Sequence, residues 1–216
     1  MRAKPNFLIV DYGVGNLYSL RRAFQFLNAS VDITEEPAAL RKADAVILPG
    51  VGTFRAGVSG LTKRGLAEAV REFATSGKPM LGICLGAQLM LSRGFEFGEH
   101  DGLNLIPGKV TILERLPDGG KIPHIGWNSV YSSRTPWENT IFDSLPNKFS
   151  VYFVHSYILE PDSPDHVLGL SSYGGLEFCS AVRKNNIYGC QFHPEKSGRD
   201  GLAIIKNFIN ISTNTA

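Results

Sequence analysis

The chain has 216 residues, of which 43% are hydrophobic and 19% charged, and its formal net charge is +2. A chain of this length and composition buries a sizeable core without disulfide or metal staples, and we expect one domain over residues 1–216. The near balance of charge and the lack of a Lys/Arg cluster argue against nucleic acid and against an anionic membrane surface as partners.

Cysteine usage and the N-terminal stretch indicate the compartment. The chain has 3 cysteines, Cys84, Cys179 and Cys190, with no C-x-x-C spacing, which argues against a disulfide framework and against a zinc site. The first apolar run, residues 7–10, is shorter than the roughly 7–15 residues of a secretory signal or the roughly 20 of a membrane span. We therefore expect a cytoplasmic protein with no membrane segment, no metal and no cofactor.

The first half of the chain alternates between strand-like and helix-like segments. Short apolar runs predict strands at residues 7–10, 30–34, 45–48 and 80–84. Apolar residues at helical spacing predict helices at 17–27, where Asn16 is available as the N-cap, at 65–76, and from residue 85 onward. This alternation predicts an α/β fold with a parallel sheet covered by helices on both faces, in which ligands bind at the carboxyl ends of the strands.

The second half of the chain is mostly strand-like. Segments at residues 109–114, 121–130, 149–159, 167–173 and 178–192 are joined by turn-rich loops. We expect them to form antiparallel ribbons added to the parallel core. Residues 200–211 predict a final helix.

The stretch GICLG at residues 82–86 has the pattern of a nucleophile elbow, known best as G-x-S-x-G. The flanking Gly82 and Gly86 remove Cβ atoms that would collide in a tight strand-to-helix turn. The following helix N-terminus favours a thiolate at Cys84, and the N–H of Leu85 points toward a developing oxyanion. The alternative is a buried structural cysteine in a Gly-rich turn.

A nucleophile needs a base, and the best sequence context is QFHPE at residues 191–195. Residues two apart in an extended segment face the same side, so His193 and Glu195 project together. A carboxylate beside an imidazole fixes its tautomer and supports its positive charge. We predict Cys84 as nucleophile, His193 as acid and base, and Glu195 as its orienting group. The alternative for His-Pro-Glu alone is a surface turn.

The turn Pro49-Gly50-Val51-Gly52 follows the third predicted strand. It lacks the length and the Gly-Lys-Ser/Thr ending of a phosphate-binding P-loop. Its glycines allow a close backbone approach and a peptide flip at low cost. We expect it to supply a second oxyanion donor.

Taken together, PGVG, GICLGAQ and QFHPEKS occur in an order that resembles the class I (triad) glutamine amidotransferases. PHIGWN at residues 123–128 and YFVHSY at 152–157 narrow the resemblance to the glutaminase subunits of imidazole glycerol phosphate synthase, in histidine biosynthesis. The resemblance covers essentially the whole chain. It implies a single-domain, flavodoxin-like α/β fold with a mostly parallel central sheet and added antiparallel strands in the second half.

The resemblance also implies residue roles. Cys84 would attack the carboxamide of L-glutamine to give a thioester, His193 would protonate the departing ammonia and then activate water, and Glu195 would hold His193. The residues that would bind the oxyanion or the glutamine are Gly50, Val51, Gly52, Leu85, Gln88, His155, Ser156 and Tyr157. For the last three, ordinary strand packing is the alternative.

Ammonia released into water at neutral pH becomes ammonium and is lost as a nucleophile, so a glutaminase needs an acceptor site. No segment of this sequence is left for a synthase domain, and the resemblance implies a separate (β/α)8-barrel cyclase subunit as heterodimer partner. The expected contact residues are Trp127, Lys196 and Asn16. Their alternatives are a core tryptophan, a solvated lysine and a helix cap.

Three other interpretations stay open. Ala87 and the stretch RGFEFGE at residues 93–99 depart from the histidine-pathway pattern and resemble a sister group that feeds ammonia to a nucleotide-sugar amidotransferase of surface polysaccharides. A stand-alone cysteine hydrolase on the same architecture would hydrolyse an amide without a partner. A catalytically dead scaffold is disfavoured by the intact Cys84, His193 and Glu195.

Overall fold

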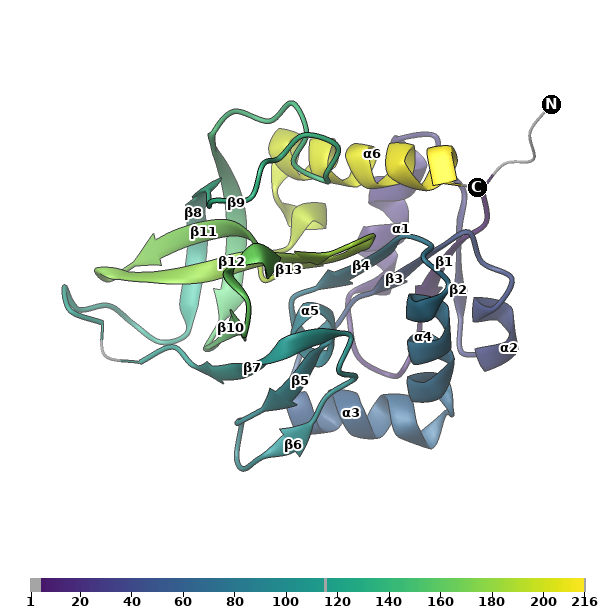
Figure 1. The fold of residues 1–216 in the computed structure, drawn as a ribbon, viewed down its shortest axis with the longest axis horizontal. Coiled ribbons are helices and arrows are strands. Elements are labelled where there is room, and N and C mark those ends of the chain that lie inside the picture. The colour runs from purple at the N-terminus through teal and green to yellow at the C-terminus, as the bar shows by residue number, and fades with distance from the viewer. Residues whose placement is uncertain (1–4, 115, 216) are drawn as a thin grey trace.

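The computed structural model describes residues 5–114 and 116–215 (Figure 1). Its parallel core comes mainly from the first half of the chain, with the strand order β2-β1-β3-β4. These strands are β1 (Phe7–Val10), β2 (Val31–Thr34), β3 (Ala45–Leu48) and β4 (Met80–Ile83). A further parallel strand, β13 (Ile187–Cys190), comes from late in the chain and pairs with β4.

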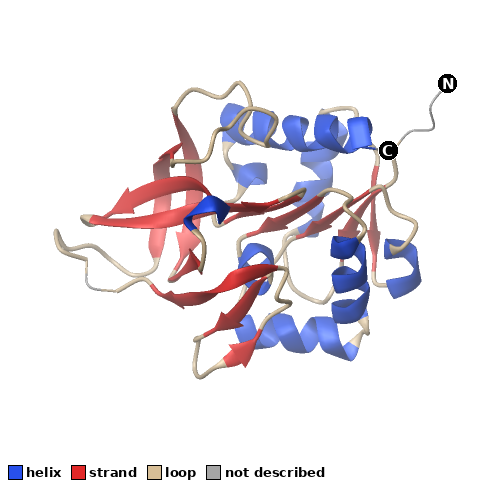
Figure 2. Cartoon of the chain, viewed as in Figure 1, coloured by secondary structure: helices blue, strands red, loops and turns tan. Residues whose placement is uncertain are grey.

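Helices cover both faces of this core. Phe7 and Ile9 of β1 pack with the buried sides of α1 (Leu17–Phe26) and α6 (Gly198–Thr215). The alternate residues Leu8 and Val10 pack toward the opposite layer. That layer consists of α2 (Pro37–Leu40), α3 (Phe54–Lys63), α4 (Leu66–Thr75) and α5 (Leu85–Leu89). In Figure 2, α6 lies above the strands and α3 below them.

The remaining strands extend the sheet beyond β13 in the order β12-β10-β7-β5-β6, with β11, β8 and β9 as a branch. Most of these pairs are antiparallel, and β5 with β7 is parallel. The strands are β5 (Leu91–Gly94), β6 (His100–Asp101), β7 (Ile106–Ile112), β8 (His124–Ser132), β9 (Lys148–His155), β10 (Tyr157–Pro161), β11 (Val167–Tyr173) and β12 (Leu176–Lys184). Two 3-10 turns complete the chain, η1 (Pro164–His166) and η2 (Pro194–Lys196).

The predicted α/β class is confirmed, and the differences are local. The expected strand 149–159 is two strands that turn at Ser156, and 178–192 is β12 followed by β13. The second half was expected to add antiparallel ribbons, but β13 joins the parallel core beside β4. Helices α2 and α3 were not predicted. No helix within the described ranges is long and apolar enough to cross a membrane.

Candidate active site

Cys84 stands between the end of β4 and the start of α5, with φ of 53° and ψ of −112°. A positive φ is rare and costly for a residue with a Cβ, and it turns the side chain out of the strand direction. The neighbouring glycines are required by space. A Cβ on Gly86 would lie 1.7 Å from the carbonyl oxygen of Leu48, and one on Gly82 would lie 2.8 Å from Cα of Ala87. The chain therefore has the geometry of the predicted elbow.

The parallel pairing of β4 with β13 brings the base to the nucleophile. Ile83 is in register with Cys190, and the N–H of Cys84 donates to the Cys190 carbonyl at 2.7 Å. The chain then continues through Phe192 to His193, whose N–H donates to the Tyr152 carbonyl at 3.0 Å.

Within the base itself, His193 Nδ1 lies 2.9 Å from Glu195 Oε1, and the two side chains are 2% and 4% exposed. A carboxylate accepts only, so Nδ1 carries the proton and Nε2 is left for the thiol. Burial lowers the pKa of His193, but the contacts with Cys84 and Glu195 outweigh it and raise the pKa to about 9. An imidazolium beside a thiol favours the thiolate.

A pocket of about 280 Å³ opens at the thiol. Its lining contains most of the side chains predicted to bind substrate: Val51, Gly52, Leu85, Gln88, His155, Ser156 and Tyr157, around Cys84. Gly50 lies behind this wall and is buried. The predicted residues that line the pocket thus come from three separate segments of the chain.

Hydrogen bonds within the protein already occupy the backbone groups around the expected oxyanion site. The N–H of Leu85 donates to the carbonyl of Gly50 at 3.3 Å. The Tyr12 hydroxyl donates to the carbonyl of Pro49, and a Cβ on Gly50 would lie 2.3 Å from that hydroxyl oxygen. Contrary to the expectation that it points at an oxyanion, the Leu85 N–H is occupied in this conformation.

Comparisons with known proteins agree with this geometry. The sequence profile described as Glutamine amidotransferase class-I matches residues 8–211. This chain belongs to the class I glutamine amidotransferase family. The predicted resemblance is confirmed, and so is the family fold.

Several proteins are similar to this amidotransferase over nearly its whole length. Imidazole glycerol phosphate synthase subunit HisH 1 of Legionella pneumophila (strain Paris) is 50% identical over 208 residues, covering 94% of this chain and 98% of that protein. The HisH subunit of Moorella thermoacetica is 46% identical over 200 residues, covering 93% and 92%. The PurLQS structure of Thermotoga maritima has a TM-score of 0.72 at 18% identity, covering 96% of this chain and 99% of that chain, and this likeness concerns the fold.

The amidotransferase residues expected at a partner interface lie on β8, on η2 and at the start of α1. Trp127 on β8 is 59% exposed, so the alternative of a core tryptophan is wrong, and its ring packs edge-on against Tyr152. Lys196 is exposed in η2, and η2 contacts α1. Asn16 caps α1, its Oδ1 accepting from the N–H of Ser19 at 3.3 Å. The capping role of Asn16 is therefore confirmed, and the contact between α1 and η2 puts these two elements side by side.

Sequence reasoning missed two polar residues of the amidotransferase site. Gln191 is fully buried, with Nε2 at 3.9 Å from Cys84 Sγ and Oε1 accepting from Gln88 at 3.1 Å. Its position directly after a strand beside the elbow was the available signal. Glu96 is the one carboxylate among the described residues that line the pocket. It lies in the stretch that was treated as a departure from the family pattern, so its carboxylate was overlooked.

The other cysteines fit structural roles. Burial raises the pKa of Cys179 to about 12 and also raises the pKa of Cys190. Both thiols are buried. Within residues 5–114 and 116–215, no group of three or more His, Cys, Asp or Glu side chains is placed to hold a metal ion.

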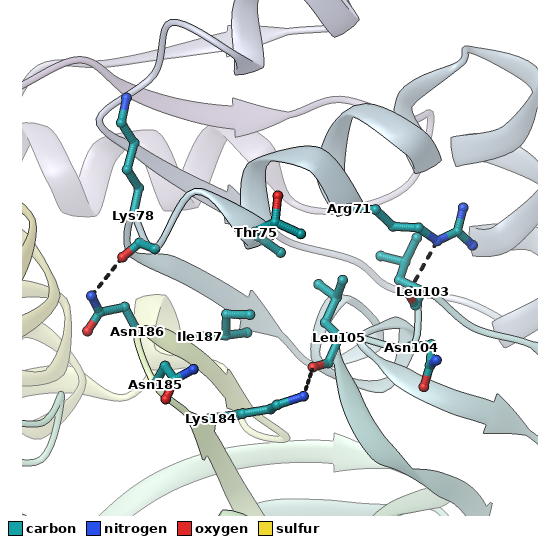
Figure 3. Close-up of a pocket in the computed structure, with 12 residues that line it drawn as sticks. Arg71, Thr75, Lys78, Leu103, Asn104, Leu105, Lys184, Asn185, Asn186 and Ile187 are labelled. Atoms are coloured by element: carbon teal, nitrogen blue, oxygen red, sulfur yellow. Dashed lines mark hydrogen bonds between the residues drawn. The ribbon is translucent and has the colours of Figure 1, made fainter.

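A second pocket, of about 520 Å³, lies at the amino ends of β4 and β13, away from the thiol (Figure 3). Its cationic side chains are bonded to backbone carbonyls. Lys184 donates to Leu105 at 3.1 Å, and Arg71 donates to Leu103 at 3.3 Å. These hydrogen bonds connect separate segments of the chain. The cationic side chains therefore stabilise the fold and do not point into a ligand site.

Proposed function

We propose that this chain is the glutaminase subunit of imidazole glycerol phosphate synthase in histidine biosynthesis. It hydrolyses L-glutamine to glutamate and ammonia and passes the ammonia to a separate (β/α)8-barrel cyclase subunit, which makes imidazole glycerol phosphate and AICAR. The observation that carries the proposal is the elbow-borne Cys84 beside a buried His193–Glu195 pair at a pocket. The names of relatives at 46–50% identity support the pathway.

The proposed reaction uses each member of the triad in turn. The Cys84 thiolate attacks the glutamine carboxamide, and the tetrahedral intermediate expels ammonia after His193 gives its Nε2 proton to the leaving nitrogen. The resulting thioester is attacked by water, which His193 deprotonates. The thiol leaves as thiolate, glutamate is released, and Glu195 keeps the imidazole oriented through Nδ1 in both halves.

The pocket supports the recognition of a free amino acid. Glu96 is placed to neutralise the α-ammonium group of glutamine, because it is the carboxylate of the lining. Gln88, His155, Ser156 and Tyr157 also line the pocket and would hold the rest of the substrate. An apolar pocket with a few placed polar groups is the usual form of a small-molecule site.

The Leu85 N–H is hydrogen-bonded to the Gly50 carbonyl and so is not free to bind an oxyanion, which supports low glutaminase activity in the isolated chain. Stabilising an oxyanion would require the Gly50 carbonyl to turn away from Leu85, after which the Val51 N–H would take its place in the pocket. The exposed Gly52, at φ of 108°, gives this turn the required freedom. We infer that the cyclase promotes this rearrangement by docking where Trp127, Lys196 and Asn16 lie.

The remaining expectations belong to the same proposal. We infer a cytoplasmic heterodimer, because the relatives are named as subunits of a biosynthetic synthase. We also infer that residues 1–216 act as one domain, although residues 1–4 and 216 at its ends lie outside the described residues. The continuous sheet from β2 to β6 supports a single unit.

The test measures glutamate release from glutamine by the chain alone, with a barrel cyclase, and with the cyclase plus its nucleotide substrate. Cys84→Ala is the inactive variant, and Cys179→Ala is the matched control because its thiol is equally buried but lies outside the pocket. Stimulation only by the complete mixture, lost in Cys84→Ala alone, supports the proposal. If the cyclase and its nucleotide substrate gave no stimulation, the alternative of a nucleotide-sugar amidotransferase as the ammonia acceptor would be favoured. Rapid hydrolysis by the chain alone would contradict a partner-dependent glutaminase.

A further inference from the structure

A continuous chain of hydrogen bonds runs from β8 to the wall of the glutamine pocket. Asn128 Nδ2 lies 3.4 Å from His124 Nε2, and His124 Nδ1 lies 3.0 Å from His155 Nε2. His155 Nδ1 lies 2.8 Å from the carbonyl oxygen of Tyr157. The same carbonyl accepts from Gln88 Nε2 at 3.4 Å. His124 and His155 are buried, at 2% and 5% exposure.

The donors and acceptors fix the proton on every ring nitrogen. A carbonyl only accepts, so His155 carries its proton on Nδ1 and its Nε2 accepts. His124 must then donate from Nδ1, which leaves its Nε2 to accept from Asn128. The orientation of Asn128 is set independently, because its Oδ1 accepts from the N–H of Ser129 at 2.7 Å and its Nδ2 donates to the carbonyl of Ser172 at 2.8 Å.

This pattern is complete only when both rings are neutral. A second proton on His155 would face the Nδ1–H of His124, and one on His124 would face the amide hydrogens of Asn128. The pKa values agree: both are lowered to about 4, mainly by burial, and for His155 this value includes smaller lowering effects of the nearby His124 and His193. Aromatic rings also hold His124, with Tyr173 stacked at 4.0 Å and Phe153 at 4.9 Å between ring centroids.

The chain reaches the reacting group through the pocket wall. Gln88, which shares the Tyr157 carbonyl with His155, donates also to Gln191, and Gln191 donates to the Cys84 sulfur at 3.9 Å. At the other end, His124 and Asn128 lie on one face of β8, and Trp127 lies on its exposed face. One strand therefore joins the proposed docking surface to the groups that hold glutamine.

We propose that His124 and His155 are positioning residues that act as a neutral, direction-fixed pair. They hold the Tyr157 carbonyl, and through it the Gln88 amide, in the geometry that binds glutamine, and they connect this wall to β8. The inference rests on the proposed glutaminase function. In this proposal His155, which lines the pocket, supports the Tyr157 carbonyl directly. His124 lies outside the pocket lining and holds the ring of His155 in place.

The first test is kinetic, on the full heterodimer. His124→Phe keeps the stacking between Tyr173 and Phe153 but removes both hydrogen bonds. Leaving His155 Nε2 buried and unpaired frees that ring to move and with it the Tyr157 carbonyl, so KM for glutamine should rise about 10-fold while kcat stays within about threefold. His124→Gln accepts and donates at similar positions and should recover most of the loss. His166→Phe, in η1 and away from the pocket, is the matched control.

The second test does not depend on catalysis. Nitrogen-15 NMR of the wild-type heterodimer should show both rings neutral at pH 6–7, each protonated on Nδ1, and His124→Phe should shift the Nε2 signal of His155. An Nε2-protonated or cationic ring would overturn the proposal, as would an unchanged KM in His124→Phe. A wild-type complex that hydrolyses no glutamine would refute the proposed function, and the NMR result would still decide whether the pair exists.

Discussion

The buried His193–Glu195 pair makes Glu195→Gln an informative substitution. The two side chains are 2% and 4% exposed and meet at 2.9 Å, so the charge of Glu195 acts on the imidazole with little screening by water. The substitution keeps the size of the side chain and removes its charge. The new amide nitrogen would also compete with the Nδ1–H of His193, which favours the wrong tautomer.

The magnitude follows from the pKa of His193, which is raised from 6.5 to about 9. At about 1.36 kcal/mol for each pKa unit, the net difference is about 3 kcal/mol, which is what remains after burial lowers the pKa and the contacts with Cys84 and Glu195 raise it. Because the folded-state pKa is raised, this stabilisation is fully present below pH 6.5 and is lost as the pH rises through about 9. Glu195→Gln should lower the pKa of His193 and weaken that pH dependence, because burial remains while one of the two contacts that oppose it is lost. We expect kcat to fall by about 10²- to 10⁴-fold.

The assay combines three measurements on wild type and variant: NMR titration of His193, urea unfolding at pH 6, 7.5 and 9.5, and glutaminase kinetics with the cyclase. Glu177→Gln is the control, because Glu177 is an exposed carboxylate that accepts from Tyr131 and lies away from the thiol. If Glu195→Gln left both the pKa of His193 and the pH dependence of unfolding as in wild type, the electrostatic reasoning would be refuted.

Four further substitutions, one of them a control, test the fold and the docking surface. Gly86→Ala puts a Cβ against the Leu48 carbonyl and should cost about 3 kcal/mol in urea unfolding, and a cost below about 1 would contradict the required elbow geometry. Phe142→Ala empties a fully buried aromatic site and should cost about 3–5 kcal/mol, whereas Phe26→Ala, at a 72% exposed ring, should stay within about 0.5. Trp127→Ala should leave unfolding unchanged and weaken cyclase binding by about 2 kcal/mol in calorimetry, and unchanged affinity would remove it from the interface.

The sequence predicted the local features of the site well because they depend on local chemistry. Gly82 and Gly86 are needed because a Cβ at either would collide with backbone beside the elbow, and the spacing of His193 and Glu195 puts both on one side of the chain. The turn of the backbone at Gly50 was beyond sequence reasoning. The Gly50 carbonyl accepts from Leu85 and the preceding Pro49 carbonyl accepts from Tyr12, both from other segments, and a peptide flip changes no residue pattern.

The missed elements have physical reasons as well. The sequence of α3, FRAGVSGLTK, contains two glycines that weaken a helix, yet Gly57 is there because its Cβ would lie 2.8 Å from Leu89 of α5. The break between β12 and β13 occurs at Asn185, a residue with φ of 55°, inside an otherwise strand-like run. Neither the close packing of α3 on α5 nor the pairing of β13 with β4 produces a periodic pattern of hydrophobic residues in the sequence.

The position of β13 also sets when the chain becomes an enzyme. Cys84 follows a strand made early in translation, but the strand that carries His193 to it, Ile187–Cys190, leaves the ribosome more than 100 residues later. Until that last parallel strand inserts between β4 and β12, a nascent chain holds a thiol with no base beside it. The thiol and its base are therefore brought together only after β13 has paired with β4.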